Sequence, residues 1–177
     1  YIGSPGIALN KLKDSGKNFI FFDLDKEALS NIDGYAKTLS LSDKVALHNQ
    51  DSVVGVMDML QTLPPSTFIH IDPYEIDKPA SNGKTFMDVY IEAAKAGLKC
   101  FLWYGFNTLD EKAYLNNYIS AAVSNHSIEG ASCTELIMEI IKKDSIVCNP
   151  GILGSGLLTA NISKESLLAI AIYSELL

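Results

Sequence analysis

Arginine is absent from this chain of 177 residues, so all 14 basic residues are lysine. The 21 acidic residues give a formal net charge of −7. Phosphate backbones are usually held by basic patches in which the planar arginine fork binds two oxygens at once. The composition therefore disfavours tight, non-specific binding of nucleic acid, although it leaves room for a local lysine patch. The densest lysine cluster, Lys11, Lys13 and Lys17, is more typical of a solvated helix face.

Cysteine is also scarce. Cys100, Cys133 and Cys148 stand far apart, and no CxxC pair or Cys/His cluster occurs, so we expect no metal site. An odd number of cysteines in apolar stretches is typical of reduced thiols, which predicts a cytoplasmic protein. No run of about 18 apolar residues occurs, so we expect no membrane span and no membrane partner.

The chain has the length of one domain with a real core, and we predict a single domain over residues 1–177. It begins with Tyr1 rather than Met. We therefore expect the natural protein to continue upstream of this residue.

Short β-rich runs alternate with amphipathic stretches along most of the chain. Strands are predicted over 18–23, 44–48, 67–71, 99–104, 134–141 and 156–162, and helices over 26–39, 52–63, 86–96, 109–123 and 163–177. Alternating elements predict an α/β fold with a mainly parallel sheet, and the last two strands predict a C-terminal antiparallel hairpin. This is the Rossmann-like architecture of class I methyltransferases. Ligands of such sheets bind at the carboxyl ends of the strands.

Acidic residues follow the first two predicted strands. Asp23 and Asp25 come after the first, where an acid can accept hydrogen bonds from ribose hydroxyls or cap the next helix. Asp25 suits the cap better, which leaves Asp23 as the ribose candidate. Asp51 follows the second strand and could accept an adenine amine, cap its helix, or do both.

The third predicted strand ends in Asp72-Pro73-Tyr74. An exocyclic amine is a poor nucleophile, because its lone pair is delocalised into the ring. A carboxylate and a stiffly held backbone carbonyl can accept its N–H bonds and direct the lone pair at a methyl donor, while an aromatic ring stacks on the base. The plain alternative is a strand-ending Asp-Pro turn. His70 shares a strand face with Asp72, so the two could form a pair, but we expect His70 to be a core residue. We also expect Trp103, in the next strand, to be a core residue and not a base-stacking platform.

A phosphatase of the haloacid dehalogenase type is a rival hypothesis. The run Phe21-Phe22-Asp23-Leu24-Asp25 looks like its buried strand followed by Asp-x-Asp. However, Lys26-Glu27-Ala28 stands where that family has Gly-Thr/Val-Leu, and Asp72 to Glu75 is a poor substitute for its second acidic pair.

Several motifs in order resemble the RlmJ family of 23S ribosomal RNA adenine-N6 methyltransferases, whose relatives were once described as acting in catabolism of external DNA. The matching segments are Tyr1-Ile2-Gly3-Ser4-Pro5-Gly6-Ile7-Ala8, Asp23, Asp51, Ile71-Asp72-Pro73-Tyr74-Glu75, Leu102-Trp103-Tyr104, Met138-Glu139-Ile140 and Gly151-Ile152-Leu153-Gly154-Ser155-Gly156. They span nearly the whole chain. The resemblance implies a methyltransferase that uses S-adenosylmethionine to methylate adenine N6 in RNA, with DNA as the second candidate substrate.

The resemblance also implies roles for single residues. Asp23 would face the cofactor ribose and Asp51 its adenine, with Gly3, Ser4 and Ser52 as further cofactor-binding candidates. The catalytic residues would be Asp72, Pro73 and Tyr74.

Two departures from the family pattern stand out. The family has two prolines before its aromatic residue and this chain has one. The glycine-rich cofactor loop and the central strand before it, which the family carries upstream of Gly-Ser-Pro, are also missing. A missing central strand leaves sheet edges unpaired, which predicts a homodimer through such an edge. A methyltransferase-like protein that has lost catalysis and serves in binding or assembly is the remaining alternative.

Overall fold

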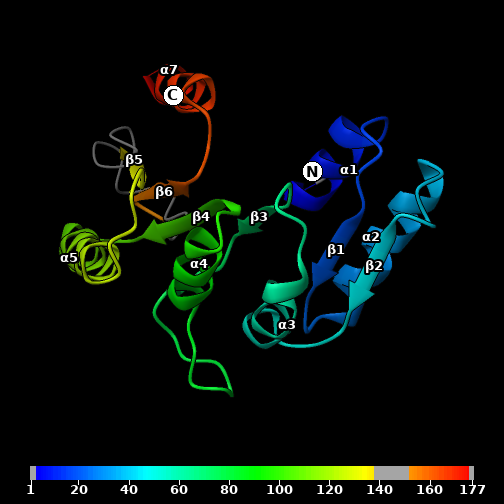
Figure 1. Cartoon of the computed structure of the whole chain (residues 1–177), viewed down its shortest axis with the longest axis horizontal. Helices are drawn as coiled ribbons and strands as arrows, with labels where there is room; N and C mark the ends of the chain where they lie inside the picture. The colour runs from blue at the N-terminus through cyan, green and yellow to red at the C-terminus, as the bar shows by residue number, and fades with distance from the viewer. Residues whose placement is uncertain (1–2, 138–151, 176–177) are drawn as a thin grey trace, which may run out of the picture. The chain divides into compact units, whose positions relative to one another are not determined.

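A computed structural model describes residues 3–137 and 152–175 (Figure 1). The chain divides into two compact units, residues 1–58 and 59–177, and each is described by itself. The prediction that both belong to one domain stays a prediction. None of the described helices is long and apolar enough to cross a membrane.

The first unit is a two-stranded parallel sheet with three helices. Its elements are α1 (Gly3–Leu12), β1 (Phe19–Phe22), α2 (Lys26–Thr38), β2 (Val45–His48) and α3 (Ser52–Met59). The sequence predicted all of these except α1, for which no element was expected before residue 18. The core of the unit contains Leu9 from α1, Phe19 from β1, and Ala36 and Leu41 from α2 and the loop after it.

A glycine lets α3 approach β1 closely. A Cβ added at Gly55 would collide with the ring of Phe22 and the side chain of Gln50. The ring of Phe22 in turn stacks on His48, with 4.8 Å between ring centroids. The helix that follows β2 is thereby held against the carboxyl ends of both strands.

The second unit is a four-stranded mixed sheet with helices. Its elements are η1 (Leu60–Thr62), β3 (Phe68–Ile71), α4 (Phe86–Lys95), β4 (Lys99–Phe106), α5 (Leu109–Asn125), β5 (Ser132–Ile137), β6 (Gly154–Ala160) and α7 (Lys164–Glu175). The strand order is β3-β4-β6-β5; β3 and β4 are parallel, and β6 is antiparallel to both of its neighbours. The predicted C-terminal antiparallel hairpin is therefore confirmed.

The strands do not form the single sheet that the sequence predicted. Among the described residues, no ladder joins β1-β2 to β3-β4-β6-β5. Alternation of strands and helices predicted one sheet because it indicates βαβ units, but it does not determine which strands pair with one another. A homodimer through one of the resulting edges stays a prediction.

One face of the four-stranded sheet is buried by aromatic and aliphatic side chains. The side chains of Cys100, Leu102, Tyr104 and Phe106 alternate along β4, and all are 0% exposed. Gly156 and Gly154 of β6 lie opposite Tyr104 and Phe106, and a Cβ at either glycine would collide with the facing ring. Glycine at these positions therefore lets each ring cross β6 toward β5.

The ring of Tyr104 crosses to a polar cluster between β5 and α5. The Tyr104 hydroxyl donates to Glu135 Oε1 at 2.9 Å and lies 3.2 Å from Cys133 Sγ. Lys112 Nζ of α5 lies 2.6 Å from Glu135 Oε2, with side chains only 22% and 19% exposed. The amide of Asn116 fits this pair with its nitrogen 2.8 Å from Glu135 and its oxygen 3.1 Å from Lys112. Burial raises the pKa of Tyr104, so its hydroxyl remains a hydrogen-bond donor at neutral pH.

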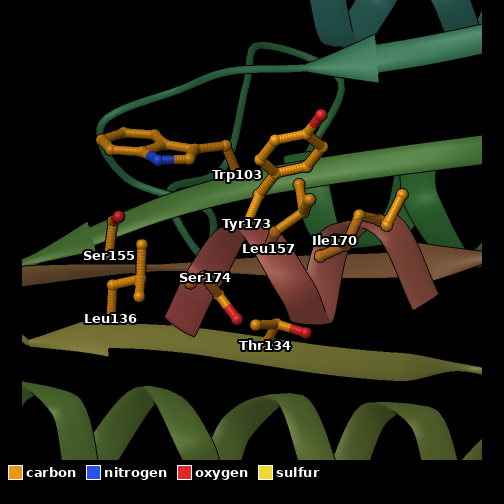
Figure 2. A pocket seen from close by; sticks show the side chains of 10 residues that line it. Trp103, Thr134, Leu136, Ser155, Leu157, Ile170, Tyr173 and Ser174 are labelled. Carbon is orange, nitrogen blue, oxygen red and sulfur yellow. The ribbon is translucent and has the colours of Figure 1, made fainter. Parts of the chain in front are cut away.

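The other sheet face carries α7 over β5 and β6. A cavity of about 360 Å³ lies between them, with Trp103 and Leu157 contributed by the sheet and Ile170 and Tyr173 by α7 (Figure 2). Trp103 was expected to be a core residue. It is instead half-buried and lines this cavity.

Candidate cofactor and substrate site

Each unit carries its own share of the predicted site. Asp23 and Asp51 follow β1 and β2 in the first unit, whereas Asp72 follows β3 in the second. Each acid stands at the carboxyl end of a parallel strand, where the fold binds ligands. The convergence of all three on one ligand stays a prediction.

Asp23 is held by the turn that leads into α2. Its Oδ1 accepts the backbone N–H of Asp25 at 2.8 Å. Asp25 is the N-cap of α2, since its own Oδ1 accepts the N–H of Glu27 at 2.8 Å. The capping role that the sequence favoured for Asp25 is confirmed. The half-buried Asp23 is fixed by one oxygen, which leaves a second carboxylate oxygen for a ligand.

Asp51 caps α3. Its Oδ1 accepts the N–H groups of Val53 and Val54 at 2.9 and 3.2 Å. Capping was one of the two roles foreseen for Asp51, and binding of an adenine amine by its other oxygen stays a prediction. Ser52, the first residue of α3, is half-buried beside it.

Asn49 is a residue that the sequence analysis missed. Its Nδ2 donates to the backbone oxygens of Asp23 and Leu24 at 3.0 and 2.9 Å. The side chain thus joins the loop after β2 to the loop after β1 and holds the backbone carbonyls of Asp23 and Leu24. The sequence did carry a signal for this contact: an amide side chain stands directly after a predicted strand, where the ends of neighbouring parallel strands meet.

Gly3 and Ser4 begin α1. Gly3 has a φ of +63°, a left-handed conformation that glycine adopts without strain. Pro5 then stands in the first turn, where its fixed φ suits a helix start. Their part in binding a cofactor stays a prediction.

Asp72 and His70 form a pair at the end of β3. His70 Nε2 lies 3.9 Å from Asp72 Oδ2, and the two side chains are 43% and 45% exposed. The interpretation of His70 as a core residue was therefore wrong. Ile69 and Ile71 take the buried face of this short strand, and His70 takes the open one.

The loop after Asp72 is fixed to the rest of the second unit at three points. Asn107 Nδ2 donates to the Tyr74 hydroxyl at 2.7 Å. Ile76 is 1% exposed, and its backbone oxygen accepts the N–H of Met87 at 3.1 Å. Tyr114 of α5 donates its hydroxyl to Asp77 Oδ2 at 2.8 Å. Tyr74 itself is 60% exposed, so most of its surface remains open.

The described residues give no support to the phosphatase hypothesis. No group of three His, Cys, Asp or Glu side chains within residues 3–137 and 152–175 is placed to hold a metal ion. The Asp-x-Asp pair on which that hypothesis depended instead shapes the start of α2.

Comparisons with known proteins add evidence on the fold. No family model and no curated protein sequence matches the chain. Among solved structures, protein LPL1258 from Legionella pneumophila, described with the family name DUF519, has a TM-score of 0.61 at 20% identity, covering 99% of this chain and 60% of that one. A SAM-dependent methyltransferase from Agrobacterium tumefaciens has a TM-score of 0.54 at 13% identity, covering 89% of this chain and 53% of that one.

The chain thus spans little more than half the length of the solved structures that it resembles. One segment behind the sequence resemblance, Met138 to Ile140, lies outside the described residues, as do Tyr1, Ile2 and Gly151 of two others. The likeness shows the fold: the chain has the Rossmann-like α/β architecture of class I methyltransferases, with a mixture of parallel and antiparallel strands.

Proposed function

We propose that this chain is the catalytic part of an S-adenosylmethionine-dependent methyltransferase that methylates the N6 amine of adenine in RNA, with DNA as the second candidate substrate. The observation that carries the proposal is Asp72-Pro73-Tyr74 at the carboxyl end of β3, in a chain with a methyltransferase fold. The sequence order of the RlmJ family supports the adenine in RNA as the target.

The three residues suit activation of an exocyclic amine. Asp72 accepts one N–H of the amine and the carbonyl of Pro73 accepts the other. The lone pair then localises on the nitrogen and can be directed at the methyl donor. Tyr74 stacks on the base and holds it. S-adenosylmethionine, when bound, supplies an electrophilic methyl group. Asp72 and Pro73 would hold the amine in line with that methyl group; S-adenosylhomocysteine would be the leaving group, and the surplus proton of the nitrogen would pass to water.

The first unit supplies groups that fit the nucleoside part of the cofactor. Asp23 keeps a carboxylate oxygen for ribose hydroxyls, and Asp51 keeps one for an adenine amine, because in each the other oxygen is committed to a backbone N–H. Gly3, Ser4 and Ser52 stand at the starts of α1 and α3, where backbone N–H groups point outward. We assign these five residues to cofactor binding.

The test is transfer of labelled methyl from S-adenosylmethionine to matched single-stranded RNA and DNA oligonucleotides, with N6-methyladenosine identified by mass spectrometry. We expect label in adenine, and more in RNA than in DNA. Oligonucleotides with adenine replaced by purine lack the amine and should take up none. Label in another base, or none in any substrate, would refute the proposed activity.

A methyltransferase-like protein without catalysis is the second candidate. The net charge of −7 and the absence of arginine favour it, because both weaken the attraction of a nucleic acid. It predicts no label in the same assay.

A further inference from the structure

We infer that Asn107 is a positioning residue that holds Tyr74 in place as a stacking platform for a flat nucleobase. The inference rests on the proposed role of Tyr74 in binding the target base. Asn107 follows the last residue of β4, and its amide reaches the Tyr74 hydroxyl across the gap between two loops. Nothing in the chemistry proposed above requires Asn107 to touch the substrate.

The exposure of Tyr74 makes such a contact necessary. A tyrosine that is 60% exposed on a loop has few packing contacts to select one rotamer. An unrestrained ring would lose its rotamer freedom when a base binds, and this loss would weaken binding. The 2.7 Å hydrogen bond at the far end of the ring restrains the ring before the base arrives, while most of the residue's surface stays exposed.

Asn107 is itself held independently of its side chain. Its backbone N–H donates to Glu111 Oε2 at 2.6 Å, in the first turn of α5. Thr108, the next residue, caps α5 by accepting the N–H of Glu111 at 3.1 Å. The backbone at Asn107 is therefore held by the start of α5. Truncating the Asn107 side chain removes the contact to Tyr74 and leaves the contact to Glu111.

The loop that carries Tyr74 is equally fixed. Ile76 and Asp77 anchor it to α4 and α5, two and three residues beyond Tyr74. These contacts hold the backbone beyond Tyr74, whereas the hydrogen bond from Asn107 acts on the ring itself. The arrangement suits a planar ligand that stacks, since the hydroxyl of the ring is occupied while 60% of the residue's surface is exposed.

The first experiment measures the contact without a ligand. In the full chain labelled with ¹³C-tyrosine, the ζ-carbon shift of Tyr74 reports the hydrogen bond at its hydroxyl. Asn107→Ala should shift this resonance, and Asn117→Ala, which removes an exposed amide on α5, should not. An unchanged resonance in Asn107→Ala would overturn the inference.

The second experiment measures stacking. A single-stranded RNA dodecamer with 2-aminopurine at one position should lose fluorescence when that base stacks on Tyr74. Asn107→Ala and Tyr74→Phe should each raise the dissociation constant about fivefold, the usual effect of one hydrogen bond. The double variant should be no weaker than either single one, because both remove the same contact. Asn117→Ala should bind as the parent does.

Two results would contradict the inference: effects of the two substitutions that add, or a parent protein that does not quench the probe. Binding of S-adenosylhomocysteine, measured on the same samples, separates this failure from that of the proposed function. Cofactor binding without stacking would remove the roles given to Asn107 and Tyr74 and leave methyl transfer itself in place, whereas loss of both would remove the methyltransferase proposal as well.

Discussion

Replacing Asp72 by alanine should lower methyl transfer by at least about a hundredfold, the usual effect of removing a group that stabilises a developing charge. The side chain supplies the proposed acceptor for the target amine, and without it the lone pair stays delocalised in the ring. Asp72→Asn keeps a carbonyl oxygen at the same place and should retain part of the activity. Initial rates of label transfer to the RNA oligonucleotide measure both effects.

The matched control is Glu92→Ala, which removes a half-buried acid, paired with Lys95, from α4 in the same unit. It should leave the rate unchanged. Asp72 is itself 45% exposed, so its loss should change the melting temperature little, which circular dichroism can check. An Asp72→Ala protein that is folded and still transfers methyl at the parent rate would refute the role given to this carboxylate.

The second large effect concerns stability. Lys112→Met should lower the free energy of unfolding of the second unit by about 2–3 kcal/mol, because it leaves the carboxylate of Glu135 beside α5 without its cation. The expected loss of unfolding free energy is at or below the lower end of the range found when a buried ion pair is broken, because both side chains keep some contact with solvent. Urea unfolding followed by the fluorescence of Trp103, the chain's only tryptophan, reports on this unit.

Two further variants identify the cause. Lys37→Met breaks the exposed pair with Asp33 on α2 and should cost less than about 0.5 kcal/mol. Lys112→Met combined with Glu135→Leu removes both charges and should recover most of the lost stability. If Lys112→Met lowered the free energy of unfolding no more than Lys37→Met does, the pair of Lys112 and Glu135 would not stabilise the β5–β6 hairpin against α5.

The sequence predicted the elements well wherever local signals were strong. The apolar run of β1 lies between Gly16 and Asp25, a turn and a helix cap, and the structure places the strand within the predicted range. Pro64-Pro65 ended the helical pattern after residue 63, and the structure ends η1 at Thr62. The helix over Gly3–Leu12 was missed, because its first three residues carry two helix-disfavouring types, glycine and proline.

Contacts between distant residues were beyond such reasoning. The link from Tyr104 across Gly156 to Glu135 depends on the register of three strands, which periodicity does not determine. The bond between Asn107 and Tyr74 joins residues 33 positions apart. The open position of His70 was misjudged because alternation gives the face of a strand but not what covers that face.

The central claim is that acids at the ends of β1 and β2 bind the nucleoside of S-adenosylmethionine. Calorimetric titration of the protein with S-adenosylhomocysteine tests it most directly. Asp23→Asn and Asp51→Asn keep an oxygen for the backbone contacts at 2.8 and 2.9 Å but lose the charged acceptor, so each should weaken binding about tenfold. Asp43→Asn, an exposed turn residue of the same unit, should bind as the parent does. Equal affinity in all four proteins, or no heat from any of them, would contradict the claim.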